Sequence, residues 1–145
     1  SNEVYSNLLG IKNTGNGITE NTYMYPFIRM RNMKLLEKPN NIEELISNTD
    51  KGILIEKISM GEVNVYTGDF SILVTKSYII NNGVIKEELD EFVLNYNIRQ
   101  LIEADMEVCN DIESCMSLCG KFGVVVKVNY CTPSVCIKWP KKVGV

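Results

Sequence analysis

Hydrophobic and polar positions alternate along residues 51–85 in a pattern that predicts three antiparallel strands and two turns. The apolar runs at residues 53–55 and 71–80 are rich in β-branched and aromatic side chains, which favour strands. Residues 67–69, Thr-Gly-Asp, have turn chemistry, because glycine adopts positive φ angles without a steric cost. Residues 81–83, Asn-Asn-Gly, lie between apolar runs, and an Asn-Gly pair favours a type I′ hairpin turn. We therefore predict an antiparallel β-meander.

The strand predicted over residues 71–80 has two unlike faces, because alternate side chains of a strand point to opposite sides of the sheet. One face is apolar except at Lys76, and we expect it to face the core; its members are Ile72, Val74, Tyr78 and Ile80. The other face is small and hydroxylated, with Ser71, Thr75 and Ser77 beside Leu73 and Ile79. It is either solvent surface, which we favour, or a surface that another strand approaches closely.

Two short helices are predicted, one on each side of the meander. Asn41 is a suitable N-cap for an amphipathic helix that would end near Gly52. A second helix over residues 98–106 has apolar positions at helical spacing, and Asn95 or Asn97 would cap it.

The remaining segments complete a chain of the α+β class, with a largely antiparallel sheet and about two helices. Residues 1–24 are rich in Asn and Gly and predict a flexible N-terminal segment, whereas residues 25–145 predict one folded domain. Within that domain we expect extended segments at residues 25–30 and 92–94, a surface turn at 86–91, and strands at 124–126 and 134–139 separated by a turn near Asn129.

Composition narrows the chemistry of this 145-residue chain. The net charge is −3 with no basic stripe, so we expect no direct nucleic-acid partner. No apolar run is long enough to span a membrane and no signal peptide is recognisable, so we expect no membrane partner and a cytoplasmic location. The absence of histidine excludes a Ser-His-Asp triad or a His-ligated metal built from this chain alone. The five cysteines are an odd number, which favours reduced thiols.

Several polar motifs are candidates for function. Cys119-Gly120-Lys121 combines a thiol, room for close backbone approach and a positive charge. Asn110-Asp111 either caps a turn, which we favour, or orients a nearby ligand. The carboxylates at residues 87–91 are interpreted as a solvated face.

The order of short motifs along the chain resembles the C-terminal region of the TldD/PmbA proteins. These are called modulators of DNA gyrase and are known as metallopeptidases of peptide maturation. The matching segments begin near residue 25 and run to the end of the chain: PFIRM-RN, IEELI, KGILI, TGDFS, YIINNG, CNDI, CGK and TPSV.

This resemblance implies a zinc site to which the chain contributes one ligand, Cys119. In the TldD branch two His of an HExxxH helix and the Cys of the CGK segment hold zinc, and the Glu of that helix is the general base. The resemblance further implies that Gly120, Lys121, Asn110 and Asp111 support the site and that Gly61, Gly68 and Asp69 line a substrate channel. Because no HExxxH is present, the chain is expected to be an inactive C-terminal fragment of an enzyme that acts on extended peptides as a homo- or heterodimer of family subunits.

Two departures from the family pattern and two alternative functions accompany this hypothesis. Cys109 stands where the family usually has Gly, and Gly61 keeps only the end of a Gly-rich run. One alternative is a non-catalytic, PmbA-like partner subunit. The other is an interaction module with a zinc site made of Cys115, Cys119, Cys131 and Cys136, which are spaced C-x3-C-x11-C-x4-C.

Overall fold

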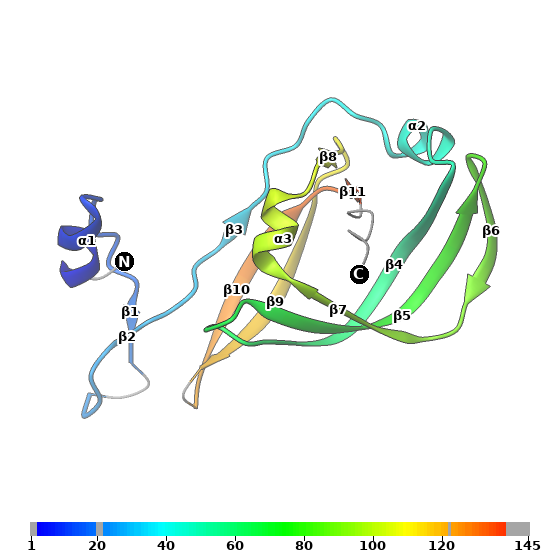
Figure 1. Cartoon of the computed structure of the whole chain (residues 1–145). Coiled ribbons are helices and arrows are strands. Elements are labelled where there is room, and N and C mark those ends of the chain that lie inside the picture. The colour runs from blue at the N-terminus through cyan, green and yellow to red at the C-terminus, as the bar shows by residue number, and fades with distance from the viewer. Residues whose placement is uncertain (1–2, 20–21, 122, 139–145) are drawn as a thin grey trace. The chain divides into compact units, whose positions relative to one another are not determined.

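The computed structural model describes residues 3–19, 22–121 and 123–138. The chain divides into two compact units (Figure 1). The hairpin unit comprises Ser1–Leu36 and Ile112–Pro133, and the sheet unit comprises Glu37–Asp111 and Ser134–Val145. The predicted α+β class with mostly antiparallel strands is confirmed, with three helices rather than two in the described residues.

The sheet unit is built around the predicted meander. Its elements are α2 (Ile42–Ser47), β4 (Lys51–Val63), β5 (Asp69–Asn81), β6 (Val84–Leu89), β7 (Phe92–Asn97), α3 (Ile98–Glu103), β8 (Met106–Val108) and β11 (Val135–Ile137). Strand β4 pairs with one edge of β5, while β6 and β7 pair with successive halves of its other edge (Figure 1). Strand β11 pairs with β8 in a separate two-stranded sheet.

The Asn-Gly hairpin is confirmed. Asn81 pairs with Val84, and the two residues between them have φ angles of 51° (Asn82) and 74° (Gly83), as a type I′ turn requires. The prediction of a surface turn at residues 86–91 is wrong, because most of this segment forms β6. Its charged side chains are compatible with a strand that has an exposed face.

Burial along β5 departs from strict alternation. Val74 and Ile80 are buried, as predicted for the core face, but Ser77 on the opposite face is only 1% exposed. The register with β4 shifts at several points between Ile55 and Gly61, which interrupts the two-residue period locally. The favoured interpretation of the hydroxylated face as solvent surface is therefore wrong at Ser77.

Both predicted helix caps are present, but the helices are shorter than expected. The Asn41 side chain accepts a hydrogen bond from Glu43 N (2.7 Å), and the Asn97 side chain accepts one from Arg99 N (2.9 Å). Helix α2 ends at Ser47, so Gly52 lies in β4 instead of at the helix exit. Helix α3 ends at Glu103, and the chain then becomes extended and enters β8 at Met106.

The hairpin unit contains one long β-hairpin and the N-terminal elements. These are α1 (Glu3–Leu9), β1 (Gly17–Ile18), β2 (Phe27–Ile28), β3 (Met33–Lys34), β9 (Glu113–Lys121) and β10 (Val124–Thr132). Strands β9 and β10 pair without a register shift, β3 joins β10 in parallel, and β1 pairs with β2. The turn predicted near Asn129 is wrong, because β10 continues through it. Elements α1 and β1 lie within residues 1–24, whose flexibility stays a prediction.

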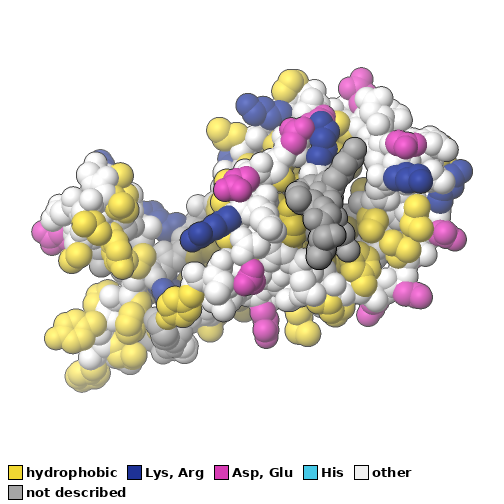
Figure 2. All heavy atoms as spheres, viewed as in Figure 1, with side chains coloured by type: hydrophobic (Ala, Val, Ile, Leu, Met, Phe, Trp, Pro, Cys, Tyr) yellow, Lys and Arg dark blue, Asp and Glu magenta, His cyan; other side chains and the backbone are white. Residues whose placement is uncertain are grey.

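Few hydrophobic side chains are buried in the described part of the chain. They include Val74, Ile80, Cys109, Val124 and Val128. Figure 2 shows hydrophobic side chains at the surface of both units. The predicted strand at residues 134–139 is confirmed over Val135–Ile137, and its last residue lies outside the described residues.

Candidate functional site

The Cys119-Gly120-Lys121 segment forms the end of strand β9. Cys119 is paired with Val126 of β10, and its side chain is partly exposed. The guanidinium of Arg29, only 3% exposed, donates one hydrogen bond to the backbone oxygen of Cys119 and another to that of Lys121, the latter at 3.0 Å. The candidate ligand is therefore held in a paired strand whose carbonyls on both sides of Gly120 are fastened by one buried arginine.

Gly120 is not required by the packing of the described residues. A Cβ atom built on it would meet nothing within 4 Å, and its φ angle is not positive. The open space next to the Cys119 backbone agrees with the room for close approach that the sequence suggested. Glycine at this position is thus unexplained by local conformation or by the packing of the described chain.

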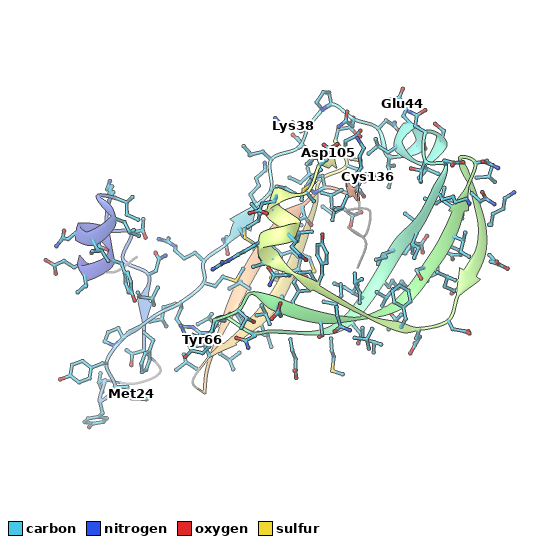
Figure 3. The ribbon with its side chains drawn as sticks, viewed as in Figure 1. Met24, Lys38, Glu44, Tyr66, Asp105 and Cys136 are labelled. Carbon is cyan, nitrogen blue, oxygen red and sulfur yellow. The ribbon has the colours of Figure 1, made fainter. Side chains whose placement is uncertain are left out.

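The four-cysteine zinc site does not fit the register of the hairpin. Cys115 and Cys119 are four residues apart on one face of β9, about 13 Å along a strand, whereas sulfurs that share a zinc ion are about 4 Å apart. Cys131 pairs with Ser114, so it lies on the opposite face from Cys115. Cys136 belongs to the sheet unit, on β11 (Figure 3). In residues 3–19, 22–121 and 123–138 no group of three or more Cys, Asp or Glu could hold a metal.

The CNDI segment joins three parts of the sheet unit. Cys109 is 1% exposed, and its backbone donates to Ser134 O (2.9 Å) and accepts from Lys38 N (3.1 Å). Asp111 Oδ1 accepts from Ser134 N (2.8 Å), and hydrogen bonding from Ser134 holds the pKa of Asp111 below its usual value. This bond joins Asp111 to a residue 23 positions further along the chain, so it is not the local Asx bond of a turn cap. The turn-capping interpretation stays a prediction.

Two further details concern this segment. Asn110 N donates to Asn40 O (3.0 Å), which adds a backbone link to the same junction. Burial raises the pKa of the Cys109 thiol, so this sulfur is neutral and packed rather than reactive. A role for Asn110 and Asp111 in orienting a ligand stays a prediction.

The Thr-Gly-Asp turn is fastened to the start of α3. Asn97 Nδ2 donates to Asp69 Oδ1 (2.7 Å) and to Thr67 O (3.1 Å), and the first of these bonds is the main cause of a lowered pKa at Asp69. Gly68 has a φ of 80°, and a Cβ on it would lie 2.7 Å from a methyl carbon of Ile98. Gly68 and Asp69 thus have structural reasons for their identity, and their place in a substrate channel stays a prediction.

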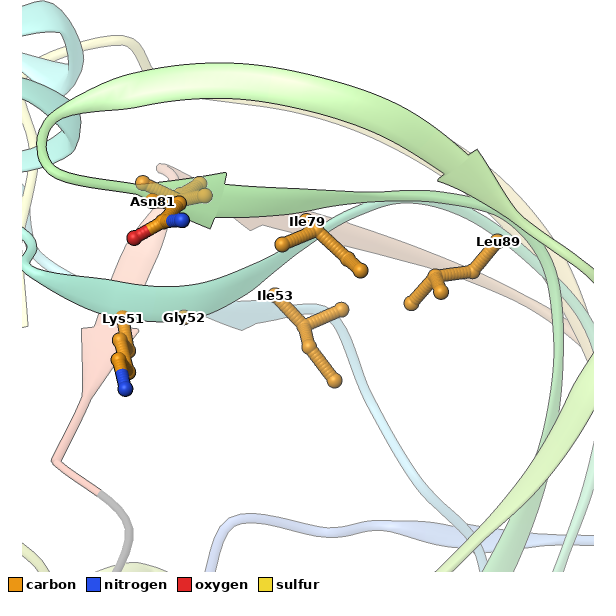
Figure 4. A pocket seen from close by; sticks show the side chains of 7 residues that line it. Lys51, Gly52, Ile53, Ile79, Asn81 and Leu89 are labelled. Atoms are coloured by element: carbon orange, nitrogen blue, oxygen red, sulfur yellow. The ribbon is translucent and has the colours of Figure 1, made fainter.

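The described residues of the sheet unit line a polar hollow and an apolar hollow. The polar one adjoins the Thr-Gly-Asp turn and includes Asp69, Ser71, Asn95, Asn97 and Arg99 in its lining. The apolar one is lined mainly by Ile53, Ile79 and Leu89, which project from three adjacent strands (Figure 4). Sequence reasoning missed the apolar hollow, although the pairing of Ile53 with Ile79 places both on the face that carries Ser77.

Gly61 allows a close approach between two strands. A Cβ on Gly61 would lie 2.9 Å from a methyl carbon of Ile72 on β5, so any larger residue here would press against Ile72. Its expected role in a substrate channel stays a prediction. No helix of the described residues is long and apolar enough to cross a membrane.

Comparison with known proteins places the chain in a family. A sequence model of the PmbA/TldA metallopeptidase C-terminal domain matches residues 1–141, so the match includes the N-terminal segment that the motifs left out. A metalloprotease TldD homologue of Buchnera aphidicola subsp. Acyrthosiphon pisum is 29% identical over 130 residues, which are 88% of this chain and 27% of that protein. A metalloprotease of Methanocaldococcus jannaschii is 30% identical over 115 residues, 79% of this chain and 25% of that protein.

Solved structures agree with these relatives. A putative modulator of a DNA gyrase from Thermotoga maritima superposes with a TM-score of 0.68 at 25% identity, covering 94% of this chain and 28% of that one. TldE from Thermococcus kodakarensis has the same fold, with a TM-score of 0.63 at 19% identity, over 91% of this chain and 28% of that one. The chain spans about a quarter of the length of its curated relatives. It belongs to the PmbA/TldA metallopeptidase family and corresponds to the C-terminal domain of that family.

Proposed function

We propose that this chain is the C-terminal part of a TldD-like zinc metallopeptidase and that Cys119 is the zinc ligand it supplies. Curated relatives that are 25–30% identical are named TldD homologues or metalloproteases, which supports a metal-dependent peptidase. The chain has no histidine, so two His ligands and the Glu base would come from an HExxxH segment outside it. The chain alone is accordingly inactive.

The observation that carries this proposal is the setting of the Cys119 thiol. It is partly exposed on a paired strand and precedes a glycine that has open space at its Cβ position, and the carbonyls on both sides of that glycine accept hydrogen bonds from Arg29. A single thiolate of this kind fits a site completed by ligands from elsewhere, because the described residues form no group of three or more Cys, Asp or Glu that could hold a metal. When bound, zinc supplies Lewis acidity, which polarises a scissile carbonyl and lowers the pKa of a water to about 7.

The residues of this chain then have defined tasks. Cys119 holds the metal, and the missing side chain at Gly120 lets the backbone of an extended peptide pass close to the ligand. The Thr-Gly-Asp turn is rigid, because Asn97 connects it to α3, and this rigidity suits the wall of a peptide channel. The whole enzyme would act on extended peptides and assemble with a second subunit of its family, homomeric or heteromeric.

The test uses the whole protein with Cys119→Ser, and Cys115→Ser as the matched control. Cys115 lies on the same strand and face and is exposed, so its loss changes a similar thiol outside the proposed metal site. Cys119→Ser should lose zinc, measured by elemental analysis, and hydrolysis of an unstructured peptide, because a neutral hydroxyl is a poor zinc ligand. Cys115→Ser should keep both.

Three outcomes would contradict the proposal. Retained zinc and activity in Cys119→Ser would remove the ligand assignment. A wild-type whole protein that binds no zinc would favour the non-catalytic, PmbA-like subunit. The proposal also requires the isolated chain to be inactive. Hydrolysis by the isolated chain that a chelator abolishes would therefore contradict it.

A further inference from the structure

Arg29 is a buried cation that makes no ion pair in the described structure. It follows β2 within the PFIRM motif, and only 3% of the residue is exposed. No carboxylate of the described residues lies within ion-pair distance of it, and its Nε has no hydrogen-bond partner among those residues. Burying a guanidinium is unfavourable unless its N–H groups make hydrogen bonds. The hydrogen bonds to two carbonyl oxygens of β9 therefore compensate for the burial of Arg29.

The two bonds require the shape of arginine. Nη1 donates to Lys121 O at 3.0 Å, and Nη2 donates to Cys119 O. These oxygens lie on either side of Gly120, and a planar fork of donors can reach both, whereas the single ammonium of lysine acts as a point charge. One side chain from about 90 residues upstream therefore restrains the backbone before and after the glycine.

The strand needs such a restraint. In the described residues β9 pairs only with β10, and the hairpin turn follows directly after Lys121. Gly120 adds backbone freedom at the same point. Strand ends next to a turn open more readily than strand centres, so without Arg29 the ligand residue would lie in the least ordered part of the hairpin.

Arg29 is itself held in place from both sides of its segment. Its backbone N donates to Asn16 O (2.9 Å), and three residues later the Asn32 side chain accepts from Asn129 N of β10 (3.0 Å). Leu35 N donates to Cys131 O (2.9 Å). The segment that carries Arg29 is therefore fastened to β10. Because its backbone is held there, the guanidinium of Arg29 can restrain the end of β9.

We propose that Arg29 is a positioning residue for the metal ligand Cys119. It restrains the backbone on both sides of Gly120, so that the thiol is presented in one orientation before zinc binds. This inference rests on the proposed function, because it takes Cys119 as a ligand. Residues that orient metal ligands typically change metal affinity 10–100-fold when they are replaced.

The first experiment compares Arg29→Lys with Arg31→Lys in the whole protein. Arg31 is an exposed arginine two residues away, and its Nη1 donates to Thr14 O (3.0 Å) and Asn16 Oδ1 (3.3 Å) instead of to β9. It therefore controls for the loss of any guanidinium in this motif. Arg29→Lys should weaken zinc binding about 10–100-fold in competition with a chelator, and Arg31→Lys should change it less than about twofold. Circular dichroism checks that both variants are folded.

The second measurement needs no functional zinc site. Amide hydrogen exchange is followed across β9 in this chain, wild type and Arg29→Lys. In the wild type the amides of residues 119–121 should be at least as protected as those of residues 114–116, despite the adjoining turn. Arg29→Lys should speed exchange at residues 119–121 and leave residues 114–116 unchanged.

The outcomes separate the two proposals. If Cys119→Ser keeps zinc, the proposed function fails whatever Arg29 does. If Cys119→Ser loses zinc while Arg29→Lys keeps both wild-type zinc affinity and wild-type exchange at residues 119–121, only the positioning role of Arg29 fails. Fast wild-type exchange at residues 119–121 would overturn that role as well, even if Arg29→Lys did not fold.

Discussion

Gly83 at the tip of the β5–β6 hairpin should be the least replaceable glycine of the sheet unit. Its N–H donates to Thr49 O (2.9 Å), and Asn82 N donates to Asp50 O (2.7 Å), so the tip is held against the segment that follows α2. Gly83 has a φ of 74°, and a Cβ added to it would lie 2.4 Å from Ser47 O. Alanine would therefore meet both a disfavoured conformation and a backbone atom that cannot rotate away.

The expected cost of Gly83→Ala has two parts. A left-handed conformation costs an L-residue about 1–2 kcal/mol, and forcing an extra methyl into a packed place costs about 1–3 kcal/mol. The sum is about 2–5 kcal/mol, a large part of the roughly 5–15 kcal/mol by which small domains are stable. Part of the tip must move away from α2 to accommodate the methyl group.

Two further variants separate these parts in urea melts followed by circular dichroism. Gly123→Ala has a φ of 79° but open space around its Cβ, so it should show the conformational cost alone, about 1–2 kcal/mol. Gly61→Ala has an ordinary φ and meets a movable methyl of Ile72 at 2.9 Å, so it should show a smaller packing cost than Gly83→Ala. A Gly83→Ala protein within about 0.5 kcal/mol of wild type, the size of ordinary surface substitutions, would refute this reasoning.

The other predictions concern the candidate site. Gly120→Ala should leave the stability of this chain within about 0.5 kcal/mol of wild type, since the added Cβ meets nothing within 4 Å. The same substitution should reduce peptide hydrolysis by the whole protein. Full activity would contradict the proposal that Gly120 lets the peptide backbone approach closely. Asn97→Ala should raise the pKa of Asp69, because the Asn97 bond is the main cause of its lowering, and an unchanged carboxyl titration by NMR would contradict this. Because the folded pKa of Asp69 is the lower one, its contribution to stability is complete above an unfolded pKa of about 3.9 and is lost as the pH falls through the folded value.

Local features of this protein could be predicted from sequence because their causes lie within a few residues. Asn41 and Asn97 cap helices through bonds to amides two residues ahead, and Asn82-Gly83 forms its turn through its own φ preferences. The α+β class and the family resemblance likewise follow from patterns and motifs along the chain. Cys119 could be named as a candidate ligand for the same reason, since the CGK motif is contiguous.

Only the tertiary structure decided the features that join distant segments. The CGK segment carries no alternating pattern, and it is a strand because β10 pairs with it along its whole length. Buried Ser77 lies where the β4–β5 register begins to shift, and the separation of Cys115, Cys119 and Cys131 follows from the register of one hairpin. The bonds from Arg29 to β9 cross about 90 residues of sequence. Sequence by itself determined the caps, the turn and the motifs, whereas pairing and register, which depend on contacts between remote residues, determined where the candidate ligand lies and what holds it.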